Sequence, residues 1–228
     1  MMSSTAPARL GNALARALGA ALRLAFAALS RVRPSAKPLH PRGTVMAGVI
    51  SRHGLDVPVD VPWIDHPGCD EVLVRMSRSV GLPSPLPDVY GMAIRVPCGP
   101  QRRGDLLLST TGTSRLTRYL LLPARRPGRR TYGSLLPYRT PSGPLLIAAA
   151  PRAEHGRDYD LLCARPTGPF RRFGRLRLQD SAGSEEEPSV SFDPVLNTVP
   201  DLLPYAWAAR LRQGAYAAAR RSRGAGDP

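Results

Sequence analysis

The chain has 228 residues, of which 43% are hydrophobic, so it can bury one substantial core but is short for two full domains. Lysine and arginine number 32 against 17 acidic residues, and the formal net charge of +15 favours anionic partners in general. Arginine and alanine are abundant throughout, and we attribute most of the charge excess to a compositional habit. The three cysteines, Cys69, Cys98 and Cys163, are far apart, which argues against a disulfide framework or a thiolate zinc site and fits a reducing cytoplasm.

The N-terminal region, residues 1–36, contains a predicted amphipathic helix. Between residues 9 and 31 there is no acidic residue, and apolar side chains recur at every fourth position from Leu10 to Phe26. Arg23 interrupts the most apolar stretch, which disfavours both a secretory signal and a transmembrane span. We expect this helix to pack on the domain or on a partner subunit, or to lie at an anionic membrane surface. The protein is therefore expected to be cytoplasmic or membrane-peripheral, and the apolar stripe makes a homo-oligomer reasonable.

Short strands dominate the next part of the chain. They are predicted over residues 44–51, 71–78, 90–96, 105–111, 116–122, 145–150, 159–164 and 173–178. Turn-rich segments separate them, and no interval is long enough for a series of crossover helices, so an antiparallel arrangement is favoured. The fold class expected is α+β, with an eight-stranded antiparallel β-barrel over residues 37–199 and helices at both ends.

The last part of the chain is predicted to be helical. Residues 180–188 are polar and acidic, as expected for an exposed loop. From about residue 200 to residue 228, apolar residues recur at helical spacing and arginines cluster towards the end. Basic residues there suit the helix dipole.

Three separated groups of residues carry the functional argument. The first is Lys37-Pro38-Leu39-His40-Pro41-Arg42-Gly43, immediately before the first strand. The second is Arg75-Met76-Ser77, followed by Asp88-Val89-Tyr90-Gly91-Met92-Ala93. The third is Phe192-Asp193-Pro194, followed by Arg212, Tyr216 and Arg223.

In this order and at these spacings the three groups resemble the catalase family and its small relatives. That resemblance extends over roughly residues 37–223 and implies a haem b cofactor. It implies His40 as the distal histidine and Tyr216 as the ligand of the ferric iron. It also implies a haem-dependent oxidoreductase of the peroxidase or catalase-like kind, acting on hydrogen peroxide or an organic hydroperoxide.

The chemistry of these residue types agrees with that assignment. A phenol binds iron as phenolate only when something stabilises the anion, and Arg212, one helical turn before Tyr216, is placed to do so. His40 has the near-neutral pKa that general acid–base catalysis on a peroxide requires, and Ser77 is expected to orient its imidazole. The haem propionates would pair with Lys37, Arg75 and Arg223.

One departure from the family concerns the distal side. Catalases carry an asparagine after an Asp-Leu pair, whereas the segment Asp105–Thr111 here has hydroxyl residues, and Thr110 is predicted to take the place of the amide. The aromatic run that follows the asparagine is also not evident. A peroxidase acting on a small-molecule peroxide is therefore expected in preference to a true catalase.

Other functions remain open from the sequence. A barrel that has kept the scaffold without haem would be a binding module. Asp60, Asp65, His53 and His66 could instead serve a metal-dependent phosphodiesterase, although their spacing fits no ligand signature. The arginine run over residues 125–130 lacks aromatic residues or a nucleic-acid motif, so a solvated loop is expected and nucleic acid is not an expected partner.

Overall fold

A computed structural model describes residues 43–79, 85–152, 156–179 and 192–208. The elements in chain order are β1 (Gly43–Arg52), α2 (Pro62–Asp65), β2 (Gly68–Arg78), β3 (Tyr90–Pro97), β4 (Arg103–Thr111), the 3₁₀ turn η1 (Thr117–Tyr119), β5 (Thr131–Gly133), β6 (Tyr138–Thr140), β7 (Gly143–Pro151), β8 (Asp158–Ala164), β9 (Arg171–Leu178) and β10 (Leu203–Pro204). Within these residues, no helix is long and apolar enough to cross a membrane.

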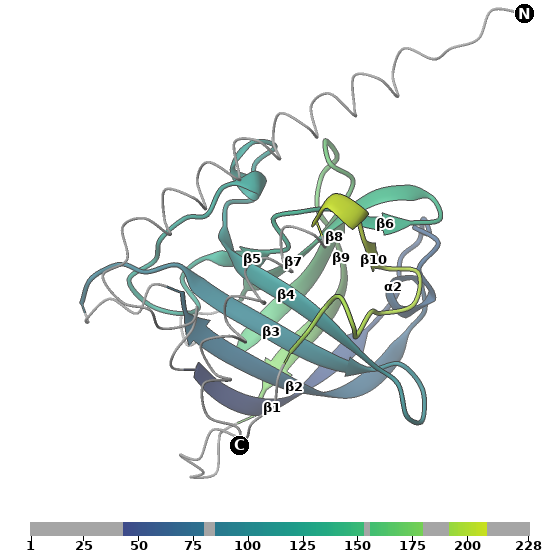
Figure 1. The fold of residues 1–228 in the computed structure, drawn as a ribbon, viewed down its shortest axis with the longest axis horizontal. Helices are drawn as coiled ribbons and strands as arrows, with labels where there is room; N and C mark the ends of the chain where they lie inside the picture. The colour runs from purple at the N-terminus through teal and green to yellow at the C-terminus, as the bar shows by residue number, and fades with distance from the viewer. Residues whose placement is uncertain (1–42, 80–84, 153–155, 180–191, 209–228) are drawn as a thin grey trace, which may run out of the picture. The chain divides into compact units, whose positions relative to one another are not determined.

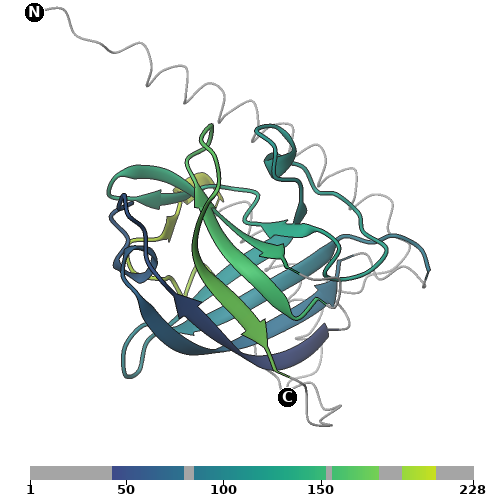
Figure 2. The same ribbon diagram turned by 180° about the vertical axis from the view of Figure 1, so that it is seen from behind.

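Eight of the strands close into an antiparallel barrel (Figures 1 and 2). The order around the barrel is β7-β5-β4-β3-β2-β1-β9-β8, and the pairing of β8 with β7 completes the ring. Closure leaves none of these eight strands as a free edge along its whole length. Strand β6 pairs in antiparallel fashion with the first three residues of β7, and β10 pairs with β6.

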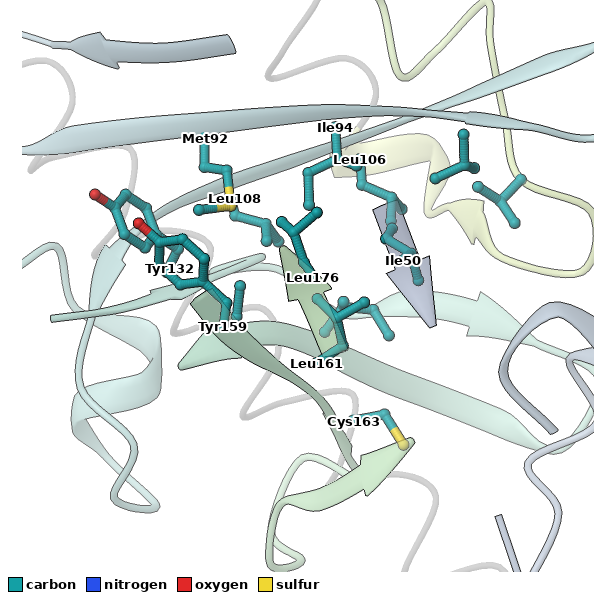
Figure 3. Packing of buried hydrophobic residues seen from close by; sticks show 14 of the residues in the cluster. Ile50, Met92, Ile94, Leu106, Leu108, Tyr132, Tyr159, Leu161, Cys163 and Leu176 are labelled. Atoms are coloured by element: carbon teal, nitrogen blue, oxygen red, sulfur yellow. The ribbon is translucent and has the colours of Figure 1, made fainter. Parts of the chain in front are cut away.

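Alternating side chains fill the barrel, because successive residues of a strand point to opposite faces. The interior positions of β2, β3 and β4 are Val72, Val74, Met92, Ile94, Leu106 and Leu108, each at most 5% exposed. Figure 3 shows Met92, Ile94, Leu106 and Leu108 facing Leu161 of β8 and Leu176 of β9 across the interior. The rings of Tyr132 and Tyr159 pack edge to face, with their centroids 5.9 Å apart. The core therefore lies inside the ring of strands, and the outward residues of the strands are not needed to fill it.

The predicted eight-stranded barrel is confirmed, with one strand misplaced. Residues 116–122 are predicted to be a strand but contain η1. At the start of η1 the Thr117 amide donates a hydrogen bond of 3.1 Å to the Ser114 hydroxyl oxygen. The Arg118 guanidinium donates to the carbonyl oxygens of Arg165 and Gly168, at 3.2 and 2.9 Å. The short β5 takes the expected strand's place in the barrel.

The helical part of the expected fold is not confirmed. Among the described residues, helix occurs at α2, at η1 and at 206–208, where the described stretch ends. The predicted N-terminal helix lies outside the described residues. The expected helix start near residue 200 is wrong, because Val199 bridges Leu202 and β10 follows directly. Helical backbone begins only at Ala206.

Candidate functional site

The outward residues of β1 to β4 form three transverse rows, which the strand register defines. The first row is Gly43, Ser77, Gly91 and Ser109; the second is Val45, Arg75, Ala93 and Leu107; the third is Ala47, Leu73, Arg95 and Asp105. Rows two residues apart are separated by about 7 Å along the strands. We call the eight residues of the first two rows the outer wall. Most of its side chains are small or aliphatic, and its polar groups are one guanidinium and two hydroxyls.

Arg75 lies across the end of β1. A Cβ atom built on Gly43 would come within 2.8 Å of the Arg75 Cζ and 2.9 Å of its Nε. Only a residue without a side chain leaves the guanidinium in this position. Gly43 therefore lets a positive charge lie close against the outer wall, beside Ser77, with which Gly43 is paired.

Ser77 and Ser109 flank Gly91 on the outer wall, since both pair with it from opposite sides. Ser77 is one of the predicted site residues and is 8% exposed. Ser109 was not predicted. The signal that identifies it is the alternation along β4, where Asp105, Leu107 and Ser109 share one face.

Thr110 lies on the opposite face of β4 from these serines. It is paired with the core residue Tyr132 and is 1% exposed. Its hydroxyl oxygen accepts a hydrogen bond of 3.2 Å from the Tyr90 amide. The structure therefore does not bring Thr110 together with Ser77, and the hydroxyl that shares the outer wall with Ser77 is that of Ser109.

The third row carries a buried ion pair. The Arg95 Nε and Nη2 donate to the two carboxylate oxygens of Asp105 at 2.7 and 2.8 Å, and the two side chains are 13% and 0% exposed. This bidentate hydrogen bonding raises the pKa of Arg95 above its ordinary value.

The same pair anchors the segment 192–197. Asp105 also accepts hydrogen bonds from the Asp193 amide at 2.8 Å and from the Asn197 Nδ2 at 2.9 Å. The Arg95 guanidinium lies 4.8 Å from the centroid of the Phe192 ring. The Phe-x-Pro motif found in the sequence is thus fixed at the third row, next to the outer wall.

The remaining predicted site residues lie outside the described residues. These are Lys37, His40, Arg212, Tyr216 and Arg223. Of the predicted set, the structure places Arg75 and Ser77 together on one face and places Thr110 on the other.

The residues considered for a metal-dependent hydrolase do not form a metal site in the part of the chain that the structure describes. No group of three or more His, Cys, Asp or Glu side chains there is arranged to hold a metal ion. Both carboxylate oxygens of Asp65 accept backbone hydrogen bonds of 2.9 Å, from Val59 and Val61. Asp65 therefore has a structural task in shaping the loop before α2.

The arginine run over residues 125–130 lies in the β4–β5 connection. Arg125, Arg126, Arg129 and Arg130 are all exposed. The backbone beside them is held by two hydrogen bonds. The Asp88 amide donates to the Ala124 carbonyl oxygen at 3.0 Å, and the Ala124 amide donates to the Asp88 carbonyl oxygen at 2.9 Å. The side chains of the run are exposed as expected, and the Arg130 Nε donates a hydrogen bond of 2.9 Å to the Pro123 carbonyl oxygen.

Solved structures with a similar fold are catalases. A fungal catalase has a TM-score of 0.55 and 14% identity, over 89% of this chain and 62% of the catalase. Catalase A from Saccharomyces cerevisiae has a TM-score of 0.58 and 13% identity, over 89% of this chain and 64% of the catalase. The chain thus spans less than two thirds of the length of either enzyme. No protein-family model and no curated protein sequence matches the chain.

These comparisons establish a catalase-like barrel fold, and the outer wall shows which group would fit it. A flat macrocycle needs a flat, largely apolar surface and cations for its carboxylates. Gly43, Gly91 and Ala93 provide a surface without projecting side chains, and Arg75 provides a cation at its edge. Arg75 and these small residues are the described residues that a haem group lying on this face would contact.

Proposed function

We propose that the protein binds haem b against the outer wall and acts as a peroxidase or catalase-like oxidoreductase. Its substrate would be hydrogen peroxide or an organic hydroperoxide. The observation that carries the proposal is the placement of Arg75, Ser77 and Ser109 on one face of a catalase-like barrel.

Two sets of residues would hold the cofactor. Arg75, together with Lys37 and Arg223, would pair with the haem propionates, since guanidinium and carboxylate groups form strong charge-assisted hydrogen bonds. Tyr216 would hold the iron through its phenolate oxygen, and Arg212 would stabilise that anion by its positive charge. Haem b, when bound, supplies a ferric iron able to accept and return electrons during cleavage of a peroxide O–O bond.

The acid–base work would fall to His40. Its imidazole would take the proton from one peroxide oxygen, the one nearer the iron, and deliver it to the other. That second oxygen would leave as water or as an alcohol. Ser77 would hold the ring in position by a hydrogen bond. His40 precedes Gly43, the first residue of β1, by three residues in the sequence.

Ser109 argues for a peroxidase rather than a fast dismutase. A serine hydroxyl can donate one hydrogen bond on the distal side, but it is shorter than an asparagine side chain and has no amide. Dismutation needs a second peroxide oriented as the reductant. A peroxidase instead takes its electrons from a separate organic donor, such as a phenol, and places a smaller demand on this position.

Absorption spectroscopy tests the proposal. The full chain is expressed with added haem precursor and purified, and a Soret band at stoichiometric intensity is expected. Tyr216→Phe should change the band's position, because the phenolate ligand is lost, while the barrel's circular dichroism stays the same. Arg75→Gln should weaken haem retention by about tenfold.

A matched control is available on a strand outside the outer wall. Arg172 on β9 is an outward arginine with a 52% exposed side chain. Arg172→Gln should leave haem retention unchanged. A colourless wild-type protein after haem supplementation would overturn the proposal and favour the haem-free scaffold.

A further inference from the structure

A groove adjoins the outer wall on the same face of the barrel. Its volume is about 770 Å³, within the range of small-molecule sites. Among the described residues, its apolar part includes Ala47 and Leu73 of the third row, with Pro97 and Pro100 of the β3–β4 hairpin. The third row is one step, about 7 Å, from the row that contains Arg75. A molecule lying in the groove would thus have one end at the outer wall.

The far end of the groove is cationic. Arg102 and Arg103 line it and are exposed, and Gln101 lies beside them. Glu71 also lines the groove, so among the described lining residues three arginines face one carboxylate. Within the described chain neither guanidinium makes a side-chain hydrogen bond or an ion pair, whereas Arg95, also in the groove, is committed to Asp105. The Cys98 amide donates to the Arg102 carbonyl at 2.8 Å and closes the hairpin, so the backbone that carries both arginines is fixed.

From this arrangement we infer that the groove binds an amphipathic carboxylate. Its carboxylate would meet Arg102 and Arg103, and its apolar body would lie over Leu73 and Ala47 towards the outer wall. Guanidinium groups match carboxylate geometry, and an aliphatic floor removes the hydrocarbon from water. Resting on the proposed function, this ligand is the organic part of the hydroperoxide substrate. The groove would then select hydroperoxides of carboxylic acids over neutral ones.

Calorimetric titration with decanoate tests the binding, whether or not haem is present. Arg102→Gln/Arg103→Gln should weaken decanoate binding by about tenfold or more. The control is Arg125→Gln/Arg126→Gln, which removes the same charge from exposed arginines of the β4–β5 connection. It should change the affinity by less than about twofold. Decanol should bind more weakly than decanoate.

Three results would overturn the groove assignment: both double variants weaken decanoate equally, neither weakens it, or decanol binds as tightly as decanoate. The haem-loaded protein gives a separate readout of substrate class. The groove variant should raise KM for a hydroperoxide of a medium-chain carboxylic acid and leave KM for cumene hydroperoxide unchanged. Equal effects on the two hydroperoxides would overturn the substrate class. A protein that takes up no haem but binds decanoate as described would contradict the proposed function and leave the groove assignment standing.

Discussion

Ser77 on β2 and Ser109 on β4 lie in one row of the barrel, with Gly91 between them. Two strand spacings, about 10 Å, separate their backbones, and the glycine leaves the space between them free of its own side chain. Two residues with hydroxyl groups therefore flank a position that has no side chain. The relationship depends on register alone, so substitutions at single positions can test it.

The first prediction separates the two hydroxyl residues of β4. Ser109→Asn places an amide on the outer wall and should raise oxygen evolution from hydrogen peroxide by about tenfold per haem. Thr110→Asn places a larger polar group in the interior, where it should cost about 1–3 kcal/mol of unfolding free energy and give no such gain. Oxygen-electrode assays and urea unfolding measure the two effects. If Thr110→Asn alone raises dismutation, the outer wall is not the substrate-facing side.

The second prediction concerns the two glycines at opposite ends of the β1–β2 ladder. Gly43→Ala brings a methyl group against Arg75 and should weaken haem binding by about tenfold, as followed by haem titration at the Soret band. Gly68→Ala is the control, since its Cβ would come within 2.2 Å of an Arg52 Nη2. This second variant should lower stability without changing haem affinity. Equal losses of haem in both variants would contradict a specific role for Arg75.

The third prediction concerns the buried pair of the third row. Asp105→Asn should cost about 3–5 kcal/mol of unfolding free energy, because it leaves the Arg95 charge buried without its counter-ion. It also weakens the acceptor for Asp193 and Asn197. Asp158→Asn removes a more exposed carboxylate, paired with Arg175, and should cost far less. Chemical denaturation of both variants gives the comparison, and similar losses would show that the burial of Asp105 has no energetic weight.

The fourth prediction is a pH dependence. Hydrogen bonds from Arg175 hold the pKa of Asp158 below its ordinary value. A carboxyl group with a lowered folded-state pKa stabilises the fold above its unfolded pKa, near 4, and loses this contribution as the pH falls through the folded value. The stability difference between wild type and Asp158→Asn should therefore be constant from about pH 7 to pH 5 and shrink below about pH 4. A difference that does not shrink in acid would contradict the ionic origin of the contribution.

The barrel could be predicted because its long strands alternate clearly. Strands β2 to β4 have a valine, methionine, isoleucine or leucine facing inward at most second positions, such as Val72 and Val74, and this alternation can be seen in each strand alone. The short elements could not be predicted in this way. Strand β5 has three residues, and η1 is held by distant carbonyl groups that bind Arg118. Such contacts leave no local signal.

The candidate site shows a second limit. Arg75 and Ser77 could be predicted together because they are two positions apart in the sequence, and residues two apart lie on the same face of a strand. Thr110 was chosen by its place in a family pattern, and an error of one residue along a strand transfers the side chain to the other face. Counting the alternation outward from Asp105 would have selected Ser109. A site on a strand is therefore best predicted by alternation first and by motif second.

The anchoring of Phe192 and Asn197 has a practical consequence for engineering. Gln179 follows β9, and Asp105 fixes where the chain returns to the barrel, so the twelve residues between Gln179 and Phe192 join two points already set by other contacts. Lengthening such a connection costs little, about 0.6 kcal/mol for each doubling. An epitope, a fluorescent domain or an affinity handle could be inserted there while the strands keep their register.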